Sequence, residues 1–261
     1  TPQLMSRQTI SLNQEGSSQN LTFCFVGDTG NVTQVQQDVS DALFKSDCSS
    51  IWHTGDIIYP SGINSADDPE FEKKFLIPFG KVLDKNINFY FSLGNHDHKK
   101  NPSAYLKIGS SNLLIHFPDF FYKKKFGDIC FFVLDTTIFD KLYMFRQRDK
   151  QISWLKKTKL SSQHECKFSL AVGHHPLFSS GDRKKASPQL SAFLKNYVFG
   201  SFDIYVAGHN HVLADEGELS GTSQLISGTG SLPGGSPEEE LQNKFNREIP
   251  GFIKLKFHFN T

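Results

Sequence analysis

The sequence of 261 residues has little net charge and no long apolar run. Its 28 basic and 27 acidic residues leave a formal charge of +1, so no overall field favours nucleic acid or an anionic membrane. No apolar stretch approaches the ~18 residues that a membrane span needs. We therefore expect no nucleic-acid partner and no transmembrane segment, and any attraction for anions must be local.

Cysteine is also scarce, with only Cys24, Cys48, Cys130 and Cys166 and no Cys-x-x-Cys spacing. This absence excludes the common zinc and redox motifs. Cys24 and Cys130 lie inside apolar runs, which favours buried free thiols. Disulfides are the alternative if the protein is exported.

Residues 1–20 lack the charged-then-apolar pattern of a signal peptide and are rich in Gln, Ser and Asn. This composition predicts a flexible leader. A leader of this kind suits a trimmed protein that is secreted, periplasmic or lumenal, and a cytoplasmic location stays open.

The rest of the chain alternates strand-like and helix-like segments. Strands are predicted at 21–27, 50–54, 87–93, 120–126, 129–135, 167–172, 202–207, 224–227 and 252–259, and helices at 32–45, 68–83, 146–160 and 189–197. The first half is typical of a parallel sheet, whereas Gly127-Asp128 predicts an antiparallel hairpin. Without repeats or long linkers, 21–261 is predicted to be one α/β domain of two packed mixed β-sheets flanked by helices, a four-layer sandwich.

What the sequence does contain is five short blocks that each place a metal ligand beside a glycine. They are Gly27-Asp28-Thr29-Gly30, Gly55-Asp56-Ile57-Ile58-Tyr59, Gly94-Asn95-His96-Asp97, Gly173-His174-His175-Pro176 and Gly208-His209-Asn210-His211. Most follow a predicted strand, so their ligands should lie on tight turns at one rim. One such match would mean little, but five with only oxygen and imidazole ligands predict a two-metal phosphoesterase site.

The ligand types divide the blocks between two ions that share one carboxylate. One ion takes Asp28, Tyr59 and His211, the other takes Asn95, His174 and His209, and Asp56 bridges them. The phenolate and carboxylates suit Fe3+, and the amide and imidazoles suit a divalent ion such as Fe2+, Zn2+ or Mn2+. In the fourth block His175 is an alternative ligand, although the position of His174 directly after the turn glycine favours His174.

These blocks resemble those of the purple acid phosphatases, in particular the small, mammalian-type, tartrate-resistant enzymes of the calcineurin-like metallophosphoesterase superfamily. Gly-Asp-x-x-Tyr at 55–59 is the diagnostic block, and the resemblance runs from about Leu21 to Ser231. It implies a binuclear acid phosphatase that hydrolyses phosphomonoesters by in-line attack of a metal-bound hydroxide. The substrates would be small phosphorylated molecules or phosphoproteins, and we expect a monomer.

Five residues are expected around the reacting phosphate. His96 would protonate the leaving group, with Asp97 orienting its imidazole. His98 and His175 are candidate substrate contacts. Arg183 lies in a basic loop where small members of the family carry a histidine, and it is a candidate phosphate ligand.

Two other functions stay open at this point. A phosphodiesterase or nucleotide-directed hydrolase would use the same centre with a different substrate pocket. A non-catalytic scaffold would keep the fold without the chemistry, but such a protein usually loses ligands, and every ligand position is filled in this sequence.

Overall fold

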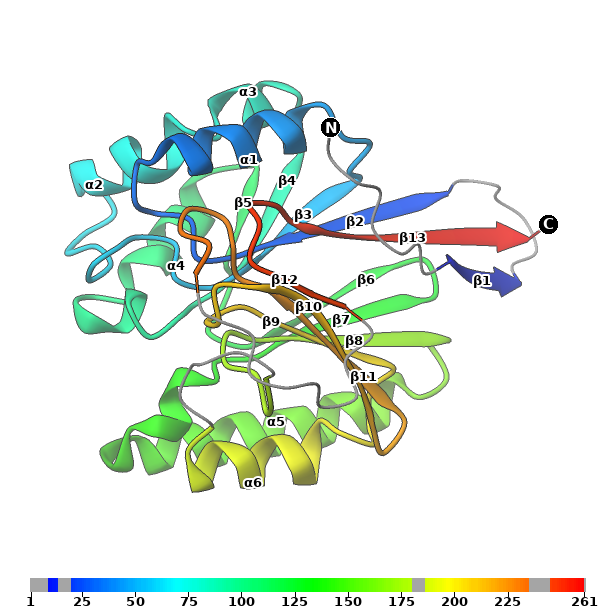
Figure 1. The fold of residues 1–261 in the computed structure, drawn as a ribbon. Helices are drawn as coiled ribbons and strands as arrows, with labels where there is room; N and C mark the ends of the chain where they lie inside the picture. The colour runs from blue at the N-terminus through cyan, green and yellow to red at the C-terminus, as the bar shows by residue number, and fades with distance from the viewer. Residues whose placement is uncertain (1–8, 14–19, 180–185, 235–244, 261) are drawn as a thin grey trace.

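The computed structural model describes residues 9–13, 20–179, 186–234 and 245–260. Two β-sheets pack face to face, and helices cover the outer face of each sheet (Figure 1). This arrangement confirms the predicted α/β sandwich of two mixed sheets.

The first sheet has six strands in the order β1-β13-β2-β3-β4-β5. Their bounds are β1 Thr9–Asn13, β2 Leu21–Val26, β3 Ser50–Thr54, β4 Asn88–Ser92, β5 Ile115–His116 and β13 Ile253–Asn260. Strands β2 to β5 are parallel, and β13 joins β2 antiparallel. Strand β1 pairs with β13, so this part of the predicted leader is a strand at the edge of the sheet.

The second sheet has seven strands in the order β12-β10-β11-β9-β8-β7-β6. Their bounds are β6 Tyr122–Phe126, β7 Ile129–Val133, β8 Phe168–Val172, β9 Ile204–Ala207, β10 Leu213–Leu219, β11 Thr222–Ser227 and β12 Phe245–Arg247. The antiparallel pairing of β6 with β7 confirms the predicted hairpin, and β7, β8, β9 and β11 run parallel.

The helices lie outside the two sheets. The α-helices are α1 Gln34–Phe44, α2 Pro69–Phe71, α3 Gly80–Asp84, α4 Ala104–Ser111, α5 Phe145–Ser162 and α6 Pro188–Tyr197. Helices α1 and α3 cover the first sheet, and α5 and α6 cover the second (Figure 1). The single helix predicted over 68–83 is instead divided into α2, a short π-helix at Glu72–Leu76 and α3, with Pro78 between the last two.

Aromatic side chains fill the space between the sheets. Trp52 of β3 stacks on Tyr90 of β4 and on Phe131 of the opposite sheet, with ring centroids 4.5 and 4.0 Å apart. Phe23 meets Phe131 edge to face at 4.7 Å. Contacts of this kind add to the area that the rings bury, so much of the chain's phenylalanine serves the core.

Both pairs of cysteines form disulfides, Cys24–Cys48 and Cys130–Cys166, with Cα atoms 5.7 and 5.6 Å apart. The expectation of buried free thiols was wrong. Each bond ties a buried strand to the loop before its parallel neighbour, and disulfides of this kind persist in oxidising compartments. Among the described residues, no helix is long and apolar enough to cross a membrane.

Candidate metal centre

The five blocks come together at one edge of the sandwich. Asp28 follows β2, Asp56 follows β3, Asn95 follows β4, His174 follows β8 and His209 follows β9. Each ligand therefore lies just beyond the carboxyl end of a strand, where the loops of neighbouring parallel strands meet. Side chains on the loops of both sheets are in contact there.

The first cluster joins Tyr59, Asp28 and His211. The Tyr59 hydroxyl donates to Asp28 Oδ1 at 2.8 Å and lies 3.2 Å from His211 Nε2. His211 Nε2 is itself 3.4 Å from Asp28 Oδ1. The structure thus brings together the three side chains that were predicted to share one ion.

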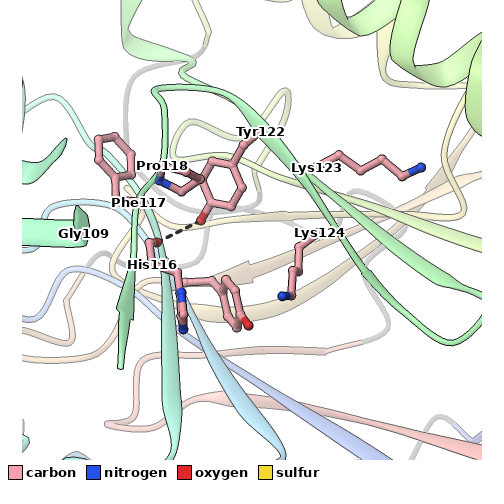
Figure 2. A pocket seen from close by; sticks show the side chains of 8 residues that line it. Gly109, His116, Phe117, Pro118, Tyr122, Lys123 and Lys124 are labelled. Carbon is pink, nitrogen blue, oxygen red and sulfur yellow. Dashed lines mark hydrogen bonds between the residues drawn. The ribbon is translucent and has the colours of Figure 1, made fainter. Parts of the chain in front are cut away.

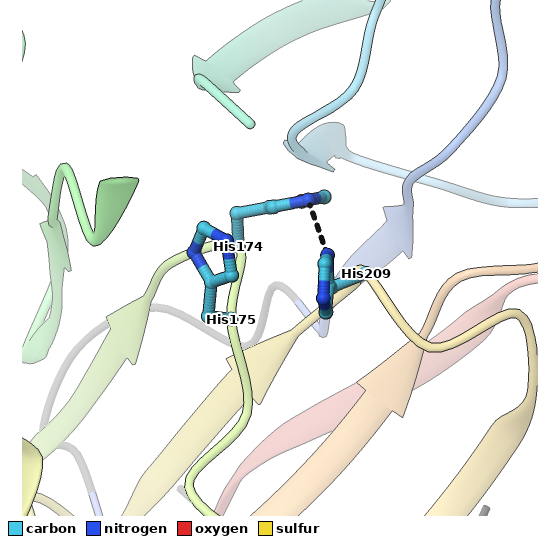
Figure 3. Close-up of side chains that lie close together, drawn as sticks. All are labelled: His174, His175 and His209. Atoms are coloured by element: carbon cyan, nitrogen blue, oxygen red, sulfur yellow. Dashed lines mark hydrogen bonds between the residues drawn. The ribbon is translucent and has the colours of Figure 1, made fainter. Parts of the chain in front are cut away.

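The second cluster forms around His174 Nε2. This atom lies 3.2 Å from Asn95 Oδ1, 3.2 Å from His209 Nδ1 and 3.4 Å from Asp56 Oδ2. His174 Nδ1 lies 2.8 Å from the Thr54 carbonyl, which can only accept, so Nδ1 carries a proton. The lone pair of neutral His174 is then on Nε2, the atom that faces His209 (Figure 3) as well as Asn95 and Asp56, which supports His174 over His175 as the ligand.

The donor set fits cations. Asp28 and Asp56 are 0% and 2% exposed, and within the described part of the chain neither forms an ion pair with lysine or arginine. Burial lowers the pKa of His174, but the Asp56 carboxylate outweighs burial and raises this pKa to about 9. The electrostatic field of the centre therefore strongly favours a positive charge next to His174 and Asp56.

Tyr59 gives a second test of fit. Burial, followed by the carboxylates of Asp28 and Asp56, raises the pKa of the Tyr59 phenol far above its usual value. The phenol would ionise only beside a cation that reverses this field. A set of two buried carboxylates, a phenol, an amide and three imidazoles suits hard or borderline metal ions, and the ligand atoms of Asp28, Asp56 and His174 lie within 4.8 Å of one another.

The turns that carry the proposed ligands combine strained backbone with close packing against glycine. Asp28, Asp56 and His209 have φ values of 59°, 53° and 67°, in the left-handed region that L-residues rarely adopt. Such conformations persist only where the surroundings fix them, and they concentrate at functional sites. A Cβ on Gly94 would lie 2.2 Å from Asp56 Oδ1, so only glycine lets that carboxylate occupy its position.

His96 lies at the edge of the centre. Its Nδ1 lies 2.6 Å from the Pro60 carbonyl and therefore donates to it, and its Nε2 is 3.9 Å from Asp56 Oδ2. The side chain is 26% exposed, so it can reach a ligand. Its geometry is compatible with the predicted role as proton donor, which stays a prediction.

Asp97 does not orient His96, and that expectation was wrong. The Asp97 carboxylate, fully buried, accepts from the backbone N–H groups of Ile57 and Gly94 at 3.1 and 2.9 Å and from the Tyr105 hydroxyl at 2.8 Å. The Pro60 carbonyl holds His96 instead. Asp97 therefore joins the second block to the third, because its carboxylate binds backbone N–H groups of both blocks.

Replacing Asp97 with asparagine should destabilise the protein. The amide offers one acceptor oxygen instead of two and turns donor hydrogens toward buried N–H groups, so we expect a loss of about 2 kcal/mol in the free energy of unfolding. Urea denaturation of Asp97→Asn would measure it. The exposed Asp84 provides a matched control, and equal stability of Asp97→Asn and Asp84→Asn would contradict this role.

Sequence reasoning missed three residues that hold the loops in place. Thr136, after β7, accepts from the backbone N–H groups of His174 and His175 at 3.2 and 3.1 Å. Ser231 donates to the Asp28 carbonyl at 2.6 Å. Asp135 Oδ2 lies 3.0 Å from His98 Nε2, and both side chains are 2% exposed. The position of residues 135 and 136 just after a strand could have indicated their role, because the five blocks also follow strands.

The expected substrate contacts have different outcomes. His98 is enclosed against Asp135, which contradicts its predicted exposure to substrate. Arg183 lies outside the described residues. His175 lies beside His174 and His209 (Figure 3).

A separate pocket of about 150 Å3, lined by residues that include His116, Tyr122 and Lys124, contains none of the five blocks (Figure 2).

A model of the calcineurin-like phosphoesterase family matches residues 21–213, which include all five blocks. The chain belongs to this family. It is 25% identical to tartrate-resistant acid phosphatase type 5 of Oryctolagus cuniculus, over 95% of this chain and 82% of that protein. The protein is thus a calcineurin-like metallophosphoesterase related to the tartrate-resistant and purple acid phosphatases, which confirms the resemblance found in the sequence.

Solved structures agree with this metallophosphoesterase fold. GAP50, described as the anchor in the inner membrane complex of Plasmodium, superposes with a TM-score of 0.77 at 20% identity, covering 91% of this chain and 81% of that one. Purple acid phosphatase PPD1 from yellow lupin (Lupinus luteus) seeds gives 0.64 at 14% identity, covering 92% of this chain and 50% of that one. At these identities the likeness establishes the fold alone.

Proposed function

We propose that this metallophosphoesterase is a binuclear acid phosphatase that hydrolyses phosphomonoesters. The observation that carries the proposal is the contact of Tyr59 with both Asp28 and His211 beside the cluster around His174. A complete donor set with a phenol in this place suits one trivalent and one divalent ion. The similarity to tartrate-resistant acid phosphatases supports the same activity.

The two ions would share Asp56. Fe3+ would be held by Asp28, Asp56, Tyr59 and His211, and Fe2+, Zn2+ or Mn2+ by Asp56, Asn95, His174 and His209. When bound, such a pair acidifies water and offsets the charge that develops on the phosphate. The chain's own contribution is to hold the ester beside His96, whose Nε2 would deliver a proton to the leaving oxygen while the Pro60 carbonyl fixes Nδ1–H.

The substrates would be small phosphorylated molecules or phosphoproteins, and the protein would act as a monomer. Two disulfides support a secreted, periplasmic or lumenal location, because such bonds are rare where thiols are kept reduced. A phosphodiesterase or nucleotide-directed hydrolase would use the same centre. Comparing rates on monoester and diester chromogenic substrates separates these activities.

A non-catalytic scaffold is the second candidate, favoured by the likeness of fold to GAP50, an anchor protein. The filled ligand positions argue against it, because a protein that has lost its chemistry has no reason to keep strained ligands. Metal analysis together with an assay of monoester hydrolysis decides between the two. Failure to bind metal after reconstitution would make the scaffold the leading function.

Replacing Tyr59 with phenylalanine tests the ferric site. Tyrosinate bound to Fe3+ gives a broad charge-transfer band in the visible spectrum, so protein purified without chelator should be coloured and contain iron, and Tyr59→Phe should lose the band. Tyr143→Phe, at a 75% exposed tyrosine, should keep it. Two metals without colour, or a rate optimum well above neutral pH, would count against Fe3+, because a trivalent ion acidifies its water more than a divalent ion does.

A further inference from the structure

The buried hydroxyl of Thr136 has three partners. The backbone N–H groups of His174 and His175 donate to its Oγ1 at 3.2 and 3.1 Å, and His175 Nδ1 lies 2.9 Å away. A threonine hydroxyl has one hydrogen to donate and two lone pairs to accept with. The two backbone groups fill both lone pairs, so the hydroxyl hydrogen must go to His175 Nδ1.

This arrangement fixes the tautomer of His175. A neutral imidazole that accepts at Nδ1 carries its hydrogen on Nε2. As a neutral metal ligand, His174 has the opposite tautomer, because its Nδ1–H donates to Thr54 and leaves the lone pair on Nε2. Two adjacent histidines therefore present opposite groups, a metal-binding lone pair from His174 and an N–H donor from His175.

The His175 ring lies beside the divalent half of the centre. Its centroid is 4.7 Å from the His174 ring and 4.6 Å from the His209 ring (Figure 3). His175 Nε2 is 3.7 Å from Asp140 Oδ2, which is longer than a hydrogen bond. Within the described part of the chain this Nε2–H group has no hydrogen-bond acceptor at close range.

We propose that Thr136 holds His175 as a neutral Nε2–H donor that binds a phosphate oxygen of the substrate beside the divalent site. The role rests on the proposed phosphatase function and adds a residue to it. A phosphate oxygen is a charged acceptor, and hydrogen bonds to charged groups are the stronger ones. His175 gives a hydrogen bond and transfers no proton, whereas Thr136 is a positioning residue that does not touch the substrate.

The tautomer can be measured without any activity. In zinc-loaded protein, the ring 15N shifts and long-range 1H–15N couplings of His175 should report hydrogen on Nε2 and none on Nδ1, with the signals assigned by their loss in His175→Gln. Thr136→Val, which removes the hydroxyl at constant shape, should release Nδ1 and mix the tautomers. Hydrogen on Nδ1 in the wild-type protein would overturn the proposal.

Two substitutions at His175 test the phosphate contact. Asparagine reaches only the Nδ1 position, so His175→Asn should weaken binding of inorganic phosphate and raise KM by about 10- to 100-fold. Glutamine places an N–H group near the Nε2 position, so His175→Gln should recover most of this loss. Both variants should retain two metal ions, and His164→Asn, at an exposed histidine, is the matched control.

Two results would contradict the proposal that His175 binds the phosphate of the substrate. Either His175→Asn binds phosphate as the wild type does, or it loses a metal ion, which would make His175 a ligand. The experiments also separate this inference from the proposed function. Wild-type protein that binds phosphate through His175 but hydrolyses no monoester would support the contact and remove the phosphatase.

Discussion

Asp56→Asn should abolish hydrolysis of a phosphomonoester, with a loss in kcat of about 10^3-fold or more, as is typical when charge stabilisation is removed from a reacting centre. The Asp56 carboxylate lies 3.4 Å from His174 Nε2 and accepts the His96 backbone N–H at 2.8 Å. It is grouped with Asp28 of one proposed site and His174 of the other, which agrees with the proposal that it is shared by both ions. An amide keeps the shape of Asp56 but removes the charge and one ligand oxygen.

The measurement is kcat on a chromogenic monoester, together with the metal content of the same sample. Asp47→Asn is the matched control, because Asp47 is exposed and paired with Lys254 and Lys256 away from the blocks. That variant should keep full activity. A fully active Asp56→Asn protein with two bound metals would show that Asp56 is not the bridge and would require a different ligand scheme.

The clustering of the proposed ligands could be predicted from sequence because its signal is local. Asp28 and Asp56 each follow a buried strand and are flanked by a glycine. The carboxyl ends of parallel strands meet at one edge, so position along the chain translated directly into position in space. The types of the donor atoms then indicated the chemistry.

The residues that hold the ligands in place gave no comparable signal. Thr136 and Ser231 are common residue types, and they act on backbone groups far away along the chain. Asp97 was assigned to its sequence neighbour His96, yet it accepts from Ile57, 40 residues away. Partners of this kind depend on how loops from separate strands pack, which no periodicity in the sequence records.

Some elements of the fold were missed for related reasons. Strand β10 contains Asp215, Glu216 and Gly217, residue types that disfavour strands, and it exists because β11 and β12 pair with its two edges. The register shifts between Asp215 and Glu218, as it does at a β-bulge. In β10, pairing with two neighbouring strands outweighs the low strand propensity of these residues.

The cysteines show the same limit. Cys24 and Cys130 are fully buried, as their apolar neighbours predicted, but burial does not distinguish a thiol from a disulfide. The partners Cys48 and Cys166 come close only because each precedes the strand that pairs beside its partner's strand. The parallel pairing of β2 with β3 and of β7 with β8 therefore decides the connectivity.

Removing the disulfides should have the largest effect on stability. The bonds join residues 24 and 36 positions apart, and cross-links closing loops of this size stabilise by about 3 to 4 kcal/mol each in the chain-entropy model. A typical domain has only about 5 to 15 kcal/mol in total. The pair variants Cys24→Ala/Cys48→Ala and Cys130→Ala/Cys166→Ala should each unfold at much lower urea concentration than the wild type.

Reduction of the wild type separates the cross-link from the packing of the sulfur atoms. Cys24 and Cys130 are fully buried, so alanine also leaves a cavity, whereas a reducing agent breaks the bond and keeps both sulfurs. Reduced wild type, which lacks both cross-links, should therefore lie between the oxidised protein and a variant in which all four cysteines are replaced by alanine. The two bonds should contribute nearly equally, because the entropy depends only on the logarithm of loop length. If native protein instead shows four titratable thiols and a stability unaffected by reductant, the cysteines are free, and the disulfide support for an exported protein disappears.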